Sequence, residues 1–300
     1  MSAFIDLIAK DLSLEQAHID KIIRGSAYYY RTYFVDKSSG GQRRIQHPNP
    51  ELKTLQYWCV HNIFSYLPVS NCAYAYIKRK SIKQNAFTHH NGRFILHLDI
   101  TDFFESITSQ HVKDVLVKNK GLFKNFDVVA ALDEITRICL RRNHLCIGAV
   151  SSPMISNVIM YDFDNEMEQY CESKKLTYTR YADDIYVSSS EFIDKDVLNY
   201  FKTHLKRMNF FINMNKTRFM SSKNRKAVTG IVLTHDKKIS VGLEMKKKVK
   251  SMIYNKMVKG IGESERIMGY LSYIKDIEPM YYNSLIIKYS KYGNVFEALK

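Results

Sequence analysis

The sequence predicts an α+β fold, in which long helices accompany a small group of short strands. Two observations support this expectation. Apolar side chains recur at helical spacing in residues 2–24, 51–66, 110–142 (with a break at Gly121), 153–173, 194–208 and most of the last sixty. Residues 94–98 and 178–187 are instead short runs rich in apolar, aromatic and β-branched side chains, as in strands. The 300 residues show neither an internal repeat nor a long linker between independent modules.

The first expected strands form an exposed hairpin near the N-terminus. Residues 27–35 are aromatic and β-prone, and the extended run resumes at residue 43 after a turn at Ser38–Gly41. Arg43 and Arg44 lie on the return strand. The hairpin is therefore either a charged, exposed edge or a mobile flap that holds phosphates, because Arg pairs bidentately with phosphate oxygens.

The run at 94–98 predicts a strand that can be buried on both faces, and Asp99 ends it. A side chain at this strand end can meet a ligand. The alternative is that Asp99 caps a helix, since a helix is expected to start around Thr108. Asp102 or Thr108 is better placed for that capping role.

Asp183 and Asp184 are adjacent and lie between two strand-like runs. The small Ala182–Asp183 step predicts a tight hairpin turn. Two carboxylates this close repel each other, so a cation is their natural companion, and hard oxygen ligands favour Mg²⁺ or Mn²⁺. A bare Asp-Asp pair is also compatible with a solvated turn.

The remaining segments connect these strands. Small residues at 145–153 form a loop, and Pro153 fits the first turn of a helix that runs to about Ser173. An extended run follows at 210–217, and a hairpin-like stretch is expected at 219–241.

The charge of +15 is concentrated in one region. Residues 201–260 contain 16 Lys and Arg against two acids, whereas the other 240 residues carry 29 basic and 28 acidic groups. Such a block indicates a polyanion partner, although a solvated helix face or a membrane-surface patch has the same composition.

Other features narrow the class of protein. No apolar run approaches the length of a membrane span, and the N-terminus lacks the pattern of a signal peptide. The five cysteines are scattered without a CxxC pair, which indicates reduced, cytoplasmic thiols rather than a zinc site or disulfides.

If folding places Asp99 beside the Asp183–Asp184 turn, three carboxylates can bind two Mg²⁺ ions about 4 Å apart. Such a site suits nucleotidyl transfer, in which positioning and charge stabilisation carry the reaction.

Four stretches resemble the motifs of reverse transcriptases. Tyr181–Asp184 resembles the YxDD motif, and residues 98–104 resemble the first palm motif. Residues 149–153 resemble the (Q)GxxxSP loop, and residues 213–217 resemble the lysine-bearing motif. A YADD run is common alone, whereas this ordered set is not.

Two further elements are similar to those of bacterial retron reverse transcriptases. Residues 85–89 match NAxxH and residues 228–230 match VTG, and the similarity extends from about Tyr28 to Tyr292. The resemblance implies a right-hand polymerase fold with fingers, a palm with an antiparallel sheet and a helical thumb. The implied domains are 1–93 (N-terminal helices and fingers), 94–225 (palm, with part of the fingers at about 110–145) and 226–300 (thumb and RNA recognition).

The resemblance also implies site residues. Asp99, Asp183 and Asp184 would be catalytic metal ligands, helped by the carbonyl of Ile100, for two Mg²⁺ ions with Mn²⁺ as a substitute. The implied nucleotide-binding residues are Arg43, Arg44, Asp102, Phe104, Ile147 and Lys216. The implied RNA-binding residues are Asn85, His89, Val228, Thr229, Gly230, Lys246, Lys247 and Lys250.

Three nucleotide-binding residues have specific implied roles. Phe104 would be the steric gate against a 2′-hydroxyl, and Lys216 would protonate the departing pyrophosphate. Ile147 departs from the family loop LPQGAPSSP, because it replaces a glutamine. Isoleucine cannot donate hydrogen bonds, so we expect fidelity or nucleotide affinity to differ while activity survives.

The implied partners are a cognate structured non-coding RNA, its RNA–DNA product, dNTPs and an effector protein from the same operon, with no membrane. The RNA would prime synthesis from a 2′-hydroxyl, giving a branched RNA–DNA hybrid within an antiphage system. Two alternatives remain open: an RNA-binding scaffold that restrains an effector, or another small bacterial reverse transcriptase of the abortive-infection or diversity-generating type.

Overall fold

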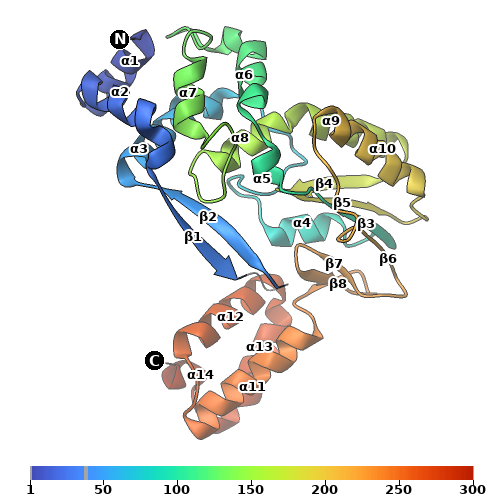
Figure 1. Ribbon diagram of the computed structural model, residues 1–300. Helices are drawn as coiled ribbons and strands as arrows, with labels where there is room; N and C mark the ends of the chain where they lie inside the picture. The colour runs from blue at the N-terminus through green and yellow to red at the C-terminus, as the bar shows by residue number, and fades with distance from the viewer. Residues whose placement is uncertain (1, 37–39, 300) are drawn as a thin grey trace.

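The computed structural model describes residues 2–36 and 40–299 (Figure 1). It is a mixed α and β structure, so the predicted fold class is confirmed. Its N-terminal helices pack side by side at one end of the molecule (Figure 1). These are α1 (Ala3–Leu12), α2 (Gln16–Gly25) and α3 (Pro50–Asn62).

An antiparallel hairpin extends from these helices, formed by β1 (Tyr30–Asp36) and β2 (Gln42–Pro48). It is a separate two-stranded sheet, and most of its side chains are exposed. The predicted hairpin is confirmed, while Ser38 and Ser39 of its expected turn lie outside the described residues.

A four-stranded antiparallel sheet lies at the centre, in the order β4-β5-β3-β6. Its strands are β3 (Phe94–Asp99), β4 (Thr177–Tyr181), β5 (Asp184–Ser189) and β6 (Arg218–Ser221). The strand at 94–98 and the hairpin at 178–187 are therefore confirmed. Ala182 takes the left-handed conformation (φ 57°) in the tight turn between β4 and β5.

Helices surround this sheet (Figure 1). They are α4 (Ile82–Thr88), α5 (Phe103–Ser106), α6 (Ser109–Lys118), α7 (Leu132–Cys139), α8 (Ser152–Ile159), α9 (Tyr161–Ser173) and α10 (Lys195–Arg207). Thr108 caps α6 together with His111, as expected for a helix that starts there.

One helix prediction was too long. The expected helix from Pro153 to about Ser173 is two helices, because the chain breaks at the buried Met160. Helical spacing continues across this break, so sequence periodicity did not reveal it. The break expected at Gly121 within 110–142 is confirmed, and it is wider than expected, because the backbone from 123 to 131 is not helical.

The C-terminal part has its own small sheet and helices, and its helices lie below the hairpin in Figure 1. The strands are β7 (Lys226–Val228), β8 (Ile231–Leu233) and β9 (Ile239–Ser240). The helices are α11 (Leu243–Lys259), α12 (Ser264–Ile277), α13 (Pro279–Tyr289) and α14 (Val295–Ala298).

Two hydrophobic cores hold the chain together. The larger core runs from Phe4 to Phe210 and includes the central sheet. The second core is made by residues from Val228 onward, joined by Ala86, Ile95 and Tyr186. Among the described residues, no helix is both long and apolar enough to cross a membrane.

Candidate active site

The end of β3 lies directly beside the turn between β4 and β5. Asp99 pairs in register with Asp184, and the backbone N–H of Ile100 donates to the Asp183 carbonyl over 2.9 Å. The sequence expectation that the strand end and the turn come together is therefore met. Antiparallel pairing brings them together although 84 residues separate Asp99 from Asp183.

Crowding of the carboxylates shows in their electrostatics. Burial, together with the neighbouring charges of Asp184 and Asp99, raises the pKa of Asp183 to about 6. Asp99 is itself buried. A site that disfavours its own negative charges in this way suits a cation with hard oxygen ligands.

Two other side chains hold these carboxylates in the structure. Lys216 Nζ donates to Asp99 Oδ2 over 2.7 Å, and His97 Nε2 lies 2.6 Å from Asp184 Oδ1. Within residues 2–36 and 40–299, no group of three or more His, Cys, Asp or Glu side chains has metal-binding geometry. The donor set fits divalent ions chemically, because Lys216 and His97 each contact only one oxygen of their carboxylate.

Lys216 reaches Asp99 because the preceding segment is fixed beside β3. Thr101 N–H donates to the Phe211 carbonyl, and Asn213 N–H donates to the Asp99 carbonyl, each over 2.8 Å. The chain then turns at residues 213–216. The hydrogen bond to Asp99 raises the pKa of Lys216, so its side chain remains an ammonium group at neutral pH.

A buried ion pair stabilises the turn between β4 and β5, and the sequence did not predict it. Arg180 Nη2 lies 2.7 Å from Asp164 Oδ2, and both side chains are fully buried. Arg180 Nη1 also donates to the Ala182 carbonyl over 3.1 Å, and Tyr178 Oη donates to Asp164 Oδ1 over 2.7 Å. An arginine inside a β-prone run was the only sequence signal.

His97 joins the site to the C-terminal sheet, which the sequence also did not indicate. Its ring stacks on Tyr186, with centroids 4.8 Å apart and an interplanar angle of 18°. Tyr186 Oη accepts a hydrogen bond from the Thr229 N–H over 3.0 Å. The VTG element therefore contacts the central sheet, and Tyr186 and His97 connect it to Asp184.

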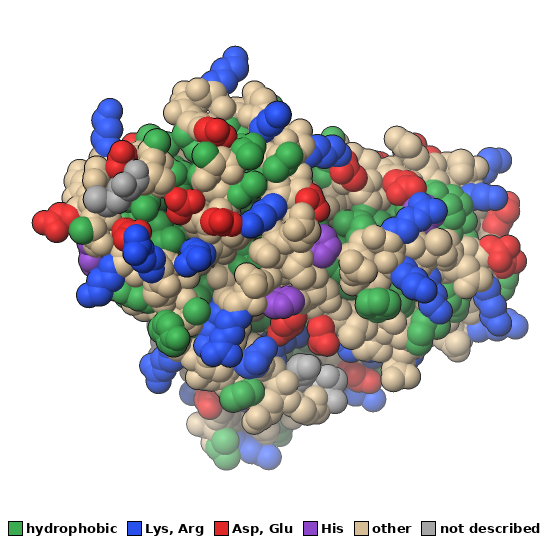
Figure 2. Space-filling model, turned by 45° about the horizontal axis from the view of Figure 1, so that its top comes forward, with side chains coloured by type: hydrophobic (Ala, Val, Ile, Leu, Met, Phe, Trp, Pro, Cys, Tyr) green, Lys and Arg blue, Asp and Glu red, His purple; other side chains and the backbone are tan. Residues whose placement is uncertain are grey.

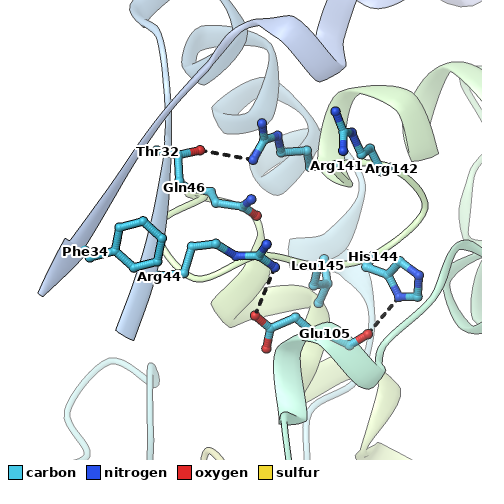
Figure 3. Close-up of a pocket in the computed structure, with 9 residues that line it drawn as sticks. All are labelled: Thr32, Phe34, Arg44, Gln46, Glu105, Arg141, Arg142, His144 and Leu145. Atoms are coloured by element: carbon cyan, nitrogen blue, oxygen red, sulfur yellow. Dashed lines mark hydrogen bonds and ion pairs between the residues drawn. The ribbon is translucent and has the colours of Figure 1, made fainter. Parts of the chain in front are cut away.

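Strand register separates the two arginines of the hairpin. Val35 pairs with Arg43 and Phe34 pairs with Arg44, so Arg43 and Arg44 project to opposite faces. Arg43 lies close enough to Tyr76 to oppose the upward shift of that residue's pKa, to which Asp183 contributes. Arg44 instead lies 3.9 Å from Glu105 (Figure 3). That both arginines hold one triphosphate stays a prediction, which their projection to opposite faces of the hairpin does not favour.

The other predicted nucleotide-binding residues are partly accessible. Asp102 is exposed and turns the chain into α5 with φ 45°, but its side chain makes no capping bond. The Ile147 carbonyl accepts from the Gln46 N–H over 2.8 Å, which ties the loop to β2. Phe104 and Tyr76 have ring centroids 6.4 Å apart, and sequence reasoning missed Tyr76.

Glycine at 148 is required for the loop to approach β2. It has φ 109°, and a Cβ atom there would lie 2.9 Å from the Gln46 carbonyl oxygen. Any larger residue at position 148 would clash with β2, which explains the glycine in this motif.

Three of the predicted RNA contacts are wrong as direct contacts, because the side chains of Asn85, His89 and Val228 are fully buried. Asn85 Oδ1 accepts from Thr179 Oγ1 over 2.6 Å. His89 bridges Ser188 and Thr179, with each ring nitrogen 2.7 Å from a hydroxyl. The NAxxH element thus fastens α4 to the back of β4 and β5.

The remaining predicted RNA contacts differ in accessibility. Thr229 is half-buried, while Gly230 and Lys247 are exposed and Lys250 is half-buried. Lys246 pairs with Glu278 and lies over the Tyr281 ring, 4.3 Å from its centroid, and its contact with RNA stays a prediction. On the face in Figure 2, Lys and Arg side chains are widely spread, with acidic side chains between them.

Comparison with known proteins decides the family. The family model described as reverse transcriptase (RNA-dependent DNA polymerase) matches residues 35–259. The retron Ec73 reverse transcriptase of Escherichia coli is 34% identical over 271 residues, covering 85% of each chain. The chain belongs to the retron reverse transcriptases. The resemblance seen in the sequence is confirmed, and the protein is an RNA-directed DNA polymerase with the polymerase fold of its family.

Other retron reverse transcriptases of Escherichia coli are similar over most of their length. The Ec83 protein is 30% identical, covering 88% of each chain. The Ec86 protein is 31% identical, covering 90% of this chain and 83% of its own. Among solved structures, a telomerase from Candida albicans aligns at 12% identity with a TM-score of 0.49, covering 88% of this chain and 58% of that chain. Enzymes of the reverse transcriptase family use divalent metal ions.

Proposed function

We propose that this retron reverse transcriptase copies part of a cognate non-coding RNA into DNA, starting from a 2′-hydroxyl of that RNA. The product is a branched RNA–DNA hybrid, or msDNA. The observation that carries the catalytic part is the convergence of Asp99, Asp183 and Asp184 at one edge of the central sheet. The 2′-hydroxyl primer is supported by family membership.

The carboxylates of Asp99, Asp183 and Asp184, with the Ile100 carbonyl, are the proposed ligands of two Mg²⁺ ions, with Mn²⁺ as a substitute. When bound, these ions lower the pKa of the primer hydroxyl and neutralise charge on the leaving pyrophosphate. The raised pKa of Asp183 supports this assignment, because the unneutralised site opposes its own negative charge.

Side chains around the carboxylates position the dNTP. Arg43 binds the triphosphate bidentately from the hairpin face opposite to Arg44. Phe104 contacts the deoxyribose and excludes a 2′-hydroxyl, while Asp102 and the Ile147 loop border the nucleotide. Lys216, which is protonated beside Asp99, gives a proton to the departing pyrophosphate once Asp99 releases it.

The C-terminal region is proposed to be the thumb, with the domain bounds expected from the sequence, and to grip the RNA and its RNA–DNA product. Thr229, Gly230, Lys247 and Lys250 keep accessible surface there. The charge block at 201–260 supports salt-dependent binding to phosphates. We place the protein in the cytoplasm, because all five cysteines are free and buried.

The biological role proposed is antiphage defence with an effector protein encoded nearby. In an alternative, the protein is an RNA-binding scaffold that restrains the effector without synthesis. That alternative has weaker support, because the three carboxylates are all present and adjacent.

The test is DNA synthesis on RNA copurified with the protein. Asp183→Asn and Asp184→Asn should each abolish synthesis while RNA remains bound, and the wild-type product should carry a 2′–5′ branch when sequenced. Asp236→Asn, an exposed carboxylate in the β8–β9 loop, is the matched control and should keep full activity. Synthesis retained by both active-site variants would sink the assignment, and an unbranched product would point to another type of reverse transcriptase.

A further inference from the structure

The β1–β2 hairpin has two chemically different faces. Phe34 pairs with Arg44 and Thr32 pairs with Gln46, and side chains alternate along a strand, so these four residues share one face. The other face carries Arg43. We call the first face the outer face, defined by Thr32, Phe34, Arg44 and Gln46.

A cavity of about 580 Å³ lies against the outer face (Figure 3). Glu105 of α5 and the loop that contains Arg141, Arg142 and His144 complete its lining. This volume is within the range of about 300–1,000 Å³ that is usual for ligand sites. None of the catalytic carboxylates lines it.

The cavity has an excess of positive charge. Three arginines face one acid, and the single ion pair between them, Arg44 to Glu105, is long at 3.9 Å. Arg141 is held in place, because its guanidinium donates to Thr32 Oγ1 over 3.2 Å and lies over the Tyr30 ring. Arg142 is exposed, and no ion pair joins it to an acid among the described residues. Guanidinium groups in this setting favour a phosphate ligand.

An aromatic ring stands beside these charges. Phe34 is 59% exposed and is the cross-strand neighbour of Arg44. An exposed ring next to arginines is the combination with which proteins bind single-stranded nucleic acid, because every base has a face that can stack.

We propose that the outer-face cavity binds one nucleotide unit of single-stranded RNA, with its phosphate on Arg44 and Arg142 and its base on Phe34. The ligand is RNA rather than a substrate nucleotide, because no catalytic carboxylate lines the cavity and Arg43, the proposed triphosphate ligand, lies on the other face of the hairpin. The choice of RNA rests on the proposed function. The site gives the enzyme a second hold on an unpaired segment of its RNA partner.

The test measures binding of a fluorescently labelled oligouridylate 12-mer to the full-length Asp183→Asn protein. This background makes no DNA, so a failure of the polymerase assignment cannot be confused with a failure of the cavity. The variants are Phe34→Ala and the double change Arg44→Gln with Arg142→Gln. The matched control is Arg31→Gln, an exposed arginine of β1 whose partner His47 places it on the opposite face.

Phe34→Ala should raise the Kd for the 12-mer on the order of tenfold, the usual scale for loss of one stacked base. The double arginine variant should raise the Kd by about tenfold or more. It should also lower the slope of log K against log salt by about 1.4, because two phosphate contacts are lost. Arg31→Gln should change the Kd by less than about twofold.

Three results would overturn the proposal. An unchanged Kd in folded variants, checked by their thermal unfolding, would show that RNA does not use the cavity. An equal loss in Arg31→Gln would show non-specific charge attraction. A raised KM for dNTPs or altered inhibition by pyrophosphate in the otherwise wild-type double variant, with unchanged RNA binding, would assign the cavity to free phosphates.

Discussion

His97 on β3 holds Asp184 on β5, with 2.6 Å between its Nε2 and Oδ1 of the carboxylate. Stacking on Tyr186 fixes the imidazole plane, and Tyr186 is in turn fixed by the Thr229 N–H. The orientation of this proposed catalytic carboxylate therefore depends on a side chain that lies outside the recognised motifs. Second partners of this kind commonly tune a metal-binding carboxylate.

Replacing His97 tests this dependence. His97→Ala should lower kcat for DNA synthesis by about 10-fold or more, the scale of one charge-assisted hydrogen bond, with little change in KM for dNTPs. His97→Gln can still donate to Asp184, so it should recover part of the rate. His235→Ala, an exposed histidine between β8 and β9, is the control. A purely structural role predicts that Gln and Ala lower kcat equally, in parallel with thermal stability.

The buried pair of Arg180 and Asp164 should dominate the stability of the turn. Asp164→Ala leaves a buried guanidinium without its partner, so we expect about 3–5 kcal/mol of destabilisation by denaturant unfolding. The control is Asp162→Ala, two residues before Asp164, which breaks an exposed ion pair with Lys118. It should cost less than about 1 kcal/mol. Similar losses in both variants would contradict the role assigned to burial.

His89 should make stability depend on pH. Burial lowers the pKa of His89 to about 3, whereas an unfolded histidine titrates near its ordinary value of about 6.5. Between these values the unfolded chain binds the extra proton, so stability falls as the pH falls. Going from pH 7 to pH 5 should cost about 2 kcal/mol from this residue.

The comparison that isolates this effect is wild type against His89→Gln. Glutamine does not titrate, so the difference in the free energy of unfolding between the two proteins should shrink toward pH 5. A difference that stays constant between pH 7 and pH 5 would show that folding leaves the pKa of His89 unchanged.

The ordered motifs were enough to predict the family, the hairpins and the meeting of Asp99 with Asp183 and Asp184. These features follow from local patterns, namely the alternation of side chains, a tight turn and a strand end. The same motifs suggested RNA contacts at Asn85, His89 and Val228, which the structure places in its interior. A motif shows only which residues occur together in the sequence. It looks the same whether those residues pack inside the protein or contact RNA.

The sequence by itself determined the chemistry of this protein, since carboxylates, arginines and a basic block point to nucleotidyl transfer on a polyanion. Only the tertiary structure decided which face each side chain serves. Arg43 and Arg44 are neighbours in sequence, yet strand alternation sends them to opposite sides of the hairpin. Arg180 is only an arginine inside a β-prone run in the sequence, and folding alone buries it against Asp164, because burial depends on how α9 packs beside β4.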